Sequence, residues 1–393
     1  MKDSAGSVAP RVPFNRPFVA GKELYYIAQA VQLGNLAGDG PFTRRCCEWM
    51  ESRFAAKKVL LTHSCTAALE MAALLCDIEA GDEAIMPSFT FVSTANAFVL
   101  RGGRPVFVDI RPDTLNMDET LVEPLVTART KAIVPVHYAS VACEMDAIMT
   151  VARQHGLLVV EDAAQAVNAT YGSRHLGTIG DLGCYSFHET KNFISGEGGA
   201  LVVNRDELLD RAVIIRDKGT NRQKYFRGEV DKYTWVDIGS SYLASELTAA
   251  FLLAQLEEAD TITQKRLAIF QRYQEGLQPL AEKGHVRLPT IPPLSRHNAH
   301  LFYILVRDEA SRRRLIDHLK QNGINVVFHY VPLHLSPMGQ RFGYQPGDLP
   351  VTEDLASRLI RLPCFFELTP DSQDYVIAQL YAFFGERRDN PRG

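Results

Sequence analysis

Short apolar runs alternate with segments of helical period through the first two thirds of the chain. Strands that are apolar along their whole length are typical of a parallel sheet whose two faces are covered by helices. We therefore expect an α/β fold built on a large mixed, mostly parallel sheet. The runs expected to form strands are KVLLTHS (58–64), EAIMPS (83–88), RPVFVDI (104–110), KAIVPVHY (131–138), LLVVED (157–162), CYSFH (184–188) and GALVVN (199–204). The segments expected to form helices are CTAALEMAALLCD (65–77), TFVSTANAFVLR (90–101) and EMDAIMTVARQHG (144–156).

The connection between the runs at 184–188 and 199–204 is too short for a crossover helix. An antiparallel or irregular connection is therefore expected there. This connection holds Lys191 and the glycine cluster GEGG at 196–199. Because lysine is almost never fully buried without a partner, a lysine between two buried strands marks a candidate reactive amine.

A long helical pattern from Ser245 to Glu282 follows and is expected to link two domains. Beyond it, LFYILVR (301–307), a charged helix through Arg314, NVVFHYV (325–331) and a final helix indicate a smaller α+β unit. We predict an N-terminal tail at 1–12, a large domain at 13–260 and a small C-terminal domain at 261–393.

Composition changes this expectation little but excludes several classes of function. The chain has 393 residues, 46% hydrophobic and 22% charged, which is ordinary for a soluble globular protein. A formal net charge of -4 and the lack of a long basic run argue against nucleic-acid binding. Seven scattered cysteines without a CxxC pair predict neither a disulfide framework nor a zinc site.

The location of the protein follows from similar arguments. The N-terminal sequence lacks the apolar core of a secretory signal. No apolar run approaches the ~20 residues that cross a bilayer, so we expect no membrane insertion. Together with reduced cysteines, these features predict a cytoplasmic protein with no structural metal.

Ligands of open parallel sheets bind beyond the carboxyl ends of the strands, so the residues at those ends are the first candidates. The first strand ends at Cys65 and Thr66, where a helix begins, and a helix N-terminus can bind an anion or simply be capped. The second strand is followed by Phe89 and Phe91, either of which could lie on a planar ring or belong to the core.

Charged and polar residues stand at the ends of the later strands. Glu161, Asp162 and Gln165 follow four apolar residues, where a buried carboxylate needs a cation or a strong donor. Ser186, His188 and Lys191 follow the next strand, and Lys191 can either extend to solvent or supply a neutral, nucleophilic amine. Taken together, an anion cradle, a ring stacker, a carboxylate and an amine match pyridoxal 5'-phosphate (PLP).

Four segments, in this order, resemble the sugar aminotransferases of the DegT/DnrJ/EryC1/StrS family. They are HSCTAALEMAALL, PSFTFVSTANA, VEDAAQA and YSFHETKNFISGEGGALVV. The resemblance extends from PFNRPFVAGKEL near the N-terminus to the final helix. It implies the aspartate-aminotransferase fold (fold type I) with PLP as cofactor.

The resemblance also implies roles for individual residues. Lys191 would bond to the cofactor aldehyde and move the proton, Asp162 would pair with the pyridine nitrogen, and Gln165 would lie on the ring-hydroxyl side. Phe91 would stack on the ring, with His188 beside the cofactor. The phosphate would be held by Cys65, Thr66 and Ser186, and the sugar nucleotide would be met by His329 and Tyr330.

The resemblance further implies a homodimer in which each site is built from both chains. Many family members carry a GYNYR-like stretch whose Asn reaches the partner's phosphate, but this chain has GSSYL. Ser241 therefore replaces Asn and Leu243 replaces Arg, and Ser241 is expected to donate one hydrogen bond instead. Ser140 also stands where a glycine is usual, which suggests a different loop shape.

Within the family, the likeness is greatest to members that form TDP-4-amino-4,6-dideoxy-D-galactose for enterobacterial common antigen. The expected reaction moves an amino group from L-glutamate to C4 of TDP-4-dehydro-6-deoxy-D-glucose and releases 2-oxoglutarate. Another keto-sugar acceptor or a non-catalytic scaffold of the same fold stays open. Related 3-dehydratases carry histidine in place of the lysine, and Lys191 argues against that activity. GNLAGDG at 34–40 follows a helical segment and is no dinucleotide fingerprint.

Overall fold

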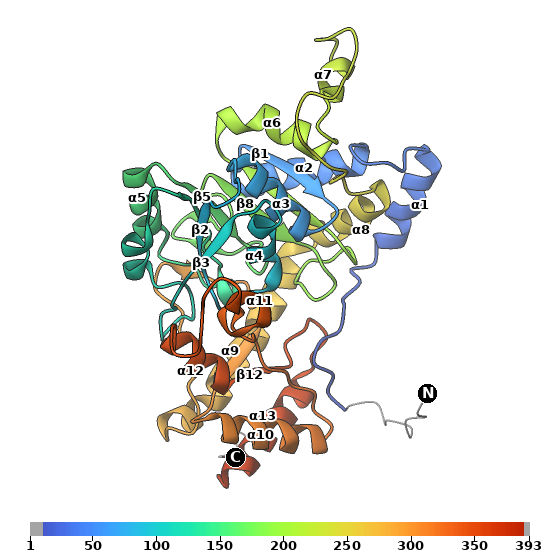
Figure 1. Ribbon diagram of the computed structural model, residues 1–393. Coiled ribbons are helices and arrows are strands. Elements are labelled where there is room, and N and C mark those ends of the chain that lie inside the picture. The colour runs from blue at the N-terminus through green and yellow to red at the C-terminus, as the bar shows by residue number, and fades with distance from the viewer. Residues whose placement is uncertain (1–10, 389–393) are drawn as a thin grey trace, which may run out of the picture.

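A computed structural model describes residues 11–388 of the chain. Its centre is a seven-stranded sheet in the order β1-β9-β8-β5-β4-β2-β3 (Figure 1). All pairs are parallel except those of β9, which runs antiparallel to both β1 and β8. The strands are β1 (Lys58–Thr62), β2 (Glu83–Pro87), β3 (Arg104–Val108), β4 (Thr130–Ile133), β5 (Leu158–Asp162), β8 (Leu182–Ser186) and β9 (Gly199–Val203). The predicted mostly parallel sheet and the antiparallel β8–β9 connection are confirmed.

Helices cover both faces of this sheet because its strands are apolar on both sides. In β9, Ala200 and Val202 face one buried cluster, whereas Leu201 and Val203 face another. This alternation follows from the two-residue period of a strand. The first face is covered by α1 (Glu23–Leu33), α2 (Pro41–Phe54), α5 (Met145–His155) and α8 (Glu246–Glu257). The second is covered by α3 (Cys65–Leu75), α4 (Val92–Val99) and α6 (Asp206–Arg216).

The C-terminal part has a core of its own beside the large sheet, at the lower end of Figure 1. Here β11 (Phe302–Leu305) pairs antiparallel with β12 (Leu359–Leu362), and α10 (Glu309–Gln321) and α13 (Pro370–Phe384) pack against them. The long helical segment is not continuous, because it breaks at Glu258 into α8 and α9 (Ala259–Glu282). Ile262 of α9 lies in the large-sheet core and Phe270 in the C-terminal core, so α9 joins the two.

Several elements differ from the expectation. NVVFHYV forms no strand, and only Val327 makes an isolated bridge, to Arg361. The partner of β11 is instead β12, which the sequence pattern did not single out. The remaining elements are a small sheet of β6 (Thr170–Tyr171), β7 (Arg174–His175) and β10 (Ser295–Arg296), and the short helices α7 (Arg222–Phe226), α11 (Pro337–Gln340) and α12 (Pro350–Arg358).

The predicted tail falls mostly outside the described residues, which begin at Arg11. Val12 is buried in the C-terminal core and exchanges backbone hydrogen bonds with Gly323 and Asn325, so the chain is packed from this point on. The boundary at 260/261 stays a prediction. Within residues 11–388, no helix is both long enough and apolar enough to cross a membrane.

Candidate active site

A cavity of about 580 Å³ opens beyond the carboxyl ends of β1, β2, β5 and β8. Residues of the C-terminal part close its other side, among them His329, Tyr330 and Arg361. Ten of the eleven site residues expected from the sequence line this cavity: Cys65, Thr66, Phe91, Asp162, Gln165, Ser186, His188, Lys191, His329 and Tyr330.

One end of the cavity is formed by the N-terminus of α3. Ser64 caps this helix by accepting a hydrogen bond from the Ala67 N–H at 3.1 Å. The N–H groups of Cys65 and Thr66 have no acceptor among residues 11–388, as expected for the first turn of a helix. Gly199 passes so close that a Cβ there would lie 2.4 Å from the Cys65 nitrogen. Free N–H groups at a helix N-terminus provide a site for a phosphate.

Asp162 lies at the end of β5 and is buried, with 6% of its surface exposed. Its Oδ2 accepts a hydrogen bond from the Thr94 hydroxyl at 2.7 Å, and its Oδ1 accepts one from the Ala164 N–H at 3.1 Å. In both bonds the carboxylate is the acceptor. Each oxygen retains acceptor capacity, which suits a protonated ring nitrogen.

Lys191 lies in a turn after β8, where its N–H donates to the His188 carbonyl at 2.8 Å. Burial lowers the pKa of its amine, and Cys65 and Asp162 partly oppose this shift. No hydrogen bond or ion pair to its Nζ occurs in the described part of the chain. The amine is therefore available for a ligand, as the neutral form that attacks an aldehyde.

Gln165, His329 and Tyr330 belong to one hydrogen-bonded wall of the cavity. Gln165 accepts from the Ala139 N–H at 2.7 Å and donates from Nε2 to the Tyr330 hydroxyl at 3.1 Å. Burial lowers the pKa of His329, so the ring is neutral. Arg361 can only donate, so its Nη1 at 3.2 Å makes His329 Nε2 the acceptor and leaves the proton on Nδ1, beside the Tyr138 hydroxyl.

Sequence reasoning missed Arg361, the cation on this wall. It lies on β12, and its Nε has no hydrogen-bond partner in the described part of the chain. No carboxylate of residues 11–388 forms an ion pair with it. Burial lowers its pKa, which reflects a charge held away from water. An arginine inside the apolar run LIRL was the available signal, but that run was not identified as a strand. Other missed residues that line the cavity include Thr90, Ser93, Thr94 and His300.

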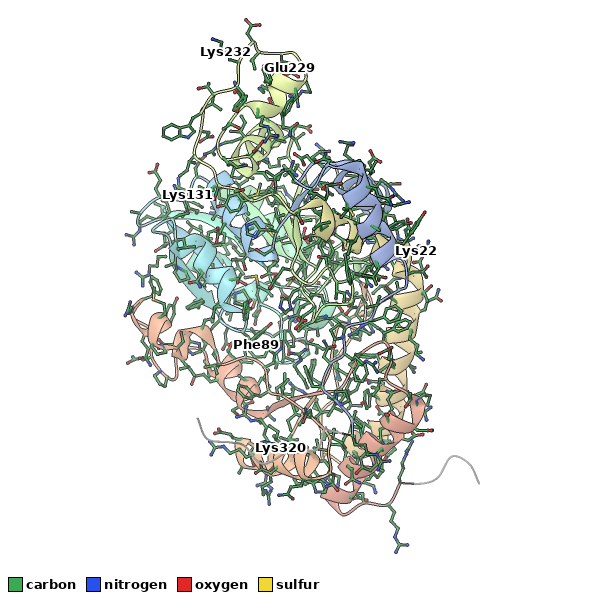
Figure 2. The ribbon with its side chains drawn as sticks, turned by 90° about the vertical axis from the view of Figure 1, so that its right-hand side faces the viewer. Lys22, Phe89, Lys131, Glu229, Lys232 and Lys320 are labelled. Carbon is green, nitrogen blue, oxygen red and sulfur yellow. The ribbon has the colours of Figure 1, made fainter. Side chains whose placement is uncertain are left out.

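Phe89 and Phe91, the two candidates for stacking on a ring, lie in different surroundings. Phe91 is 58% exposed at the start of α4 and lines the cavity, with its ring centroid 6.5 Å from that of Tyr330. Phe89 is buried in a cluster with Tyr138 and lies in the interior in Figure 2. Glu161 is also structural, because it accepts hydrogen bonds from three backbone N–H groups and contacts His137.

Ser241 is the exception among the expected residues. It is exposed and lines a second cavity of about 600 Å³, with Asp39, Lys218 and Arg222 among its neighbours. Within one chain it does not reach the first cavity. Ser140 has φ 64°, the left-handed conformation that glycine favours, so serine keeps a glycine-like backbone there.

Comparison with known proteins identifies the chain. The profile of the DegT/DnrJ/EryC1/StrS aminotransferase family matches residues 19–381. The chain therefore belongs to this family. The predicted family of sugar aminotransferases, the enzyme class, the fold and the PLP cofactor are thereby confirmed.

Individual relatives agree with the family. The aminotransferase is 35% identical over 374 residues to the spore coat polysaccharide biosynthesis protein SpsC of Bacillus subtilis, covering 93% of this chain and 95% of SpsC. DesV of S. venezuelae, solved with a ketimine intermediate, is 31% identical with a TM-score of 0.87, covering 97% and 100% of the two chains. The PLP form of Spr1654 from Streptococcus pneumoniae is 25% identical with a TM-score of 0.87, covering 95% and 98%.

The residues of the cavity fit PLP. The α3 N-terminus and Ser186 offer donors for a phosphate, Asp162 offers acceptors for a ring nitrogen, and Lys191 has an unpaired amine. These three groups line one cavity, as a single ligand of that chemistry requires.

Proposed function

We propose that the aminotransferase moves an amino group from L-glutamate to C4 of TDP-4-dehydro-6-deoxy-D-glucose. The products would be 2-oxoglutarate and TDP-4-amino-4,6-dideoxy-D-galactose, made in the cytoplasm for enterobacterial common antigen. The observation that carries the reaction class is a half-buried lysine amine, unpaired among residues 11–388, in one cavity with a buried carboxylate and a helix N-terminus. The polysaccharide role named in the relative SpsC favours a sugar acceptor.

Arg361 supports an amino-acid donor. Its Nη1 is bonded to His329, while among residues 11–388 its Nε has no hydrogen-bond partner and its Nη2 pairs with no carboxylate. A guanidinium presents Nε–H and one Nη–H as a fork that matches the two oxygens of a carboxylate. We therefore assign Arg361 to a carboxylate of L-glutamate.

Each remaining residue would act on the bound molecules in a defined way. PLP, when bound, supplies an aldehyde for the amine and a ring that withdraws electrons from the substrate carbon. Lys191 Nζ would take a proton from the amino-acid α-carbon and return it on the cofactor side. Asp162 would keep the ring nitrogen protonated, Phe91 would cover one ring face, and His329 and Tyr330 would contact the sugar.

A homodimer with shared sites is part of the proposal. The segment 221–238 projects from the large-sheet body at the top of Figure 1, and Glu229 and Lys232 lie at its tip in Figure 2. Large apolar side chains on this segment are exposed, including Phe226 at 62% and Trp235 at 79%. Exposed apolar area of this kind is typical of an interface. Ser241, on the adjoining cavity, would then reach the partner's phosphate.

Absorbance spectroscopy with the two substrates tests the proposal. L-Glutamate is expected to bleach the visible band of the PLP-loaded enzyme, and TDP-4-dehydro-6-deoxy-D-glucose is expected to restore it. Bleaching without restoration by this sugar would refute the acceptor and leave a transaminase of another nucleotide-linked keto sugar. A protein that shows no band with PLP would be a non-catalytic scaffold. In the Lys191→Ala control, turnover should fall by about 1,000-fold or more, since the proton shuttle is lost.

A further inference from the structure

Two buried threonines form a chain of hydrogen bonds that ends at Asp162. The Thr90 hydroxyl lies 2.8 Å from the Thr94 hydroxyl, which in turn donates to Asp162 Oδ2 at 2.7 Å. Thr94 has no exposed surface and Thr90 only 2%. Both residues line the cavity, and among residues 11–388 Asp162 is the one charged side chain to which either hydroxyl hydrogen-bonds.

The direction of this chain is fixed by chemistry. An ionised carboxylate can only accept, so the Thr94 proton is committed to Asp162. The Thr94 oxygen must then accept the proton of Thr90. Each donated bond polarises the next hydroxyl, which strengthens the final bond to the carboxylate. The order is therefore Thr90 to Thr94 to Asp162.

Thr94 had another option within its own helix. It lies in the first turn of α4, where a threonine hydroxyl commonly donates to the carbonyl three or four residues before it. Here the hydroxyl bonds instead to a carboxylate 68 residues away on β5. Two elements distant in sequence are thus joined through one oxygen of the Asp162 carboxylate.

We propose that Thr94, supported by Thr90, is a positioning residue that aims the Asp162 carboxylate at the pyridine nitrogen of PLP. The Thr94 hydroxyl donates to Oδ2 and the Ala164 N–H donates to Oδ1. Each oxygen of the carboxylate is therefore held by one donor. The remaining acceptor capacity of Asp162 is left for the ring N–H. This inference rests on the proposed role of Asp162 and is independent of the identity of the sugar.

The test compares two cofactors on the apoprotein of the full chain. Thr94→Val removes the hydroxyl at nearly constant volume, and Thr94→Ser retains it. The dissociation constants are measured for PLP and for the deaza analogue in which carbon replaces the ring nitrogen. We expect Thr94→Val to weaken PLP binding by about 10- to 100-fold, as for a lost hydrogen bond to a charged group. It should weaken binding of the analogue much less, and Thr94→Ser should stay near wild type.

A matched control is available outside the cavity. Thr352 is also fully buried and donates to a carboxylate, that of Asp109, at 2.7 Å. Thr352→Val should lower the melting temperature of the apoprotein without changing its preference for PLP over the analogue. The control shows whether losing any buried Thr–Asp hydrogen bond changes this preference, or only losing the bond between Thr94 and Asp162.

The variant Asp162→Asn measures how far the preference for PLP over the analogue depends on the Asp162 carboxylate. If Asp162→Asn reduces the preference for PLP but Thr94→Val does not, the positioning role of Thr94 is overturned while the role of Asp162 stands. If Asp162→Asn leaves the preference unchanged, the proposed role of Asp162 fails, and the role of Thr94 fails with it. An equal loss for both cofactors in Thr94→Val would mean that the threonine only supports the fold.

Discussion

At the scale of single residues, two basic side chains of the cavity, Lys191 and Arg361, form no ion pair with a carboxylate of the described residues. The acidic residues that line the same cavity are Asp162 and Glu197. Burial lowers the pKa of both Lys191 and Arg361, because each charge is held away from water. A substrate carboxylate would relieve this cost at Arg361, whereas the amine of Lys191 would bond to the cofactor aldehyde as the neutral form.

Arg361→Gln tests the carboxylate end of this cavity. We expect KM for L-glutamate to rise by about 10- to 100-fold, since the charge-assisted fork is lost, while KM for the sugar nucleotide changes little. Steady-state kinetics with each substrate varied in turn measure this difference. Arg358→Gln is the matched control, because Arg358 pairs with Asp354 outside the cavity. Equal effects on both KM values would contradict the assignment.

The lowered pKa of the His297 imidazole predicts how the free energy of unfolding depends on pH. Burial lowers the pKa of its imidazole to about 4, and its Nδ1 accepts a hydrogen bond from the Ala299 N–H at 3.2 Å. Below pH 6.5 the imidazole of His297 is protonated in the unfolded chain, whereas in the folded chain it stays neutral until the pH approaches about 4. The contribution of His297 is therefore complete above pH 6.5 and is lost as the pH falls from 6.5 to 4, by at most about 1.4 kcal/mol per pH unit.

His297→Asn keeps an acceptor for Ala299 but does not titrate. The melting temperature of the wild type should fall more steeply than that of His297→Asn between pH 6.5 and 4, as scanning calorimetry at several pH values would show. His300 and His329, whose pKa values are also lowered by burial, remain in both proteins and cancel in the comparison. Parallel curves for the two proteins would refute the prediction.

At the scale of elements, the phosphate end depends on how closely β9 approaches α3. Gly199 begins β9, and a Cβ at that position would meet the Ser64 carbonyl carbon at 2.3 Å. The neighbouring atoms are backbone, which cannot rotate away as a flexible side chain can. The strand and the helix N-terminus must therefore separate if this residue carries a side chain.

Gly199→Ala should consequently cost about 1–3 kcal/mol of stability and also weaken PLP binding, because overpacking displaces the N–H groups of α3. Gly276→Ala is the control. Its nearest atom would be the end of the Ile377 side chain, which can move, and alanine favours the helix α9. Denaturant unfolding and PLP titration of both variants measure the two effects. Intact PLP affinity in Gly199→Ala would show that the close approach is not needed for the site.

At the scale of the whole molecule, the cavity lies where two cores meet. The large sheet supplies Asp162, Ser186 and Lys191, and the C-terminal part supplies Arg361 and Tyr330. The two parts are joined by α9 and by Asp109, whose carboxylate accepts bonds from the first turn of α12. The second cavity, with Ser241, lies apart from this junction, and in the proposed homodimer the partner chain would complete it.

Subunit mixing tests the shared site. Lys191→Ala removes the amine, and Ser241→Trp blocks the exposed cavity without touching the first one. Each homodimer should be inactive or strongly impaired, whereas a mixture should regain about a quarter of wild-type activity, because half of randomly formed dimers hold one intact site. The protein should sediment as twice its 43.8 kDa chain mass. Full activity of Ser241→Trp alone would show that each site belongs to one chain.

The sequence by itself determined the large sheet and most of the cavity. The fully apolar strands left one arrangement that buries both faces, and in a parallel sheet their carboxyl ends meet at one edge. Asp162, Ser186 and Lys191 therefore had to lie near one another. The motifs around them are sufficient to indicate the family from the sequence alone.

The tertiary structure alone decided what faces these residues. Arg361 and the Thr90–Thr94 chain act through contacts between segments far apart in sequence, and no local pattern specifies such contacts. The sequence pattern did not predict β12, because this strand is short and pairs with a strand more than 50 residues earlier. Neither a hydrophobic period nor a hairpin turn therefore marks it. Local periodicity sets which residues are buried, whereas the packing of the two cores sets which buried polar groups meet.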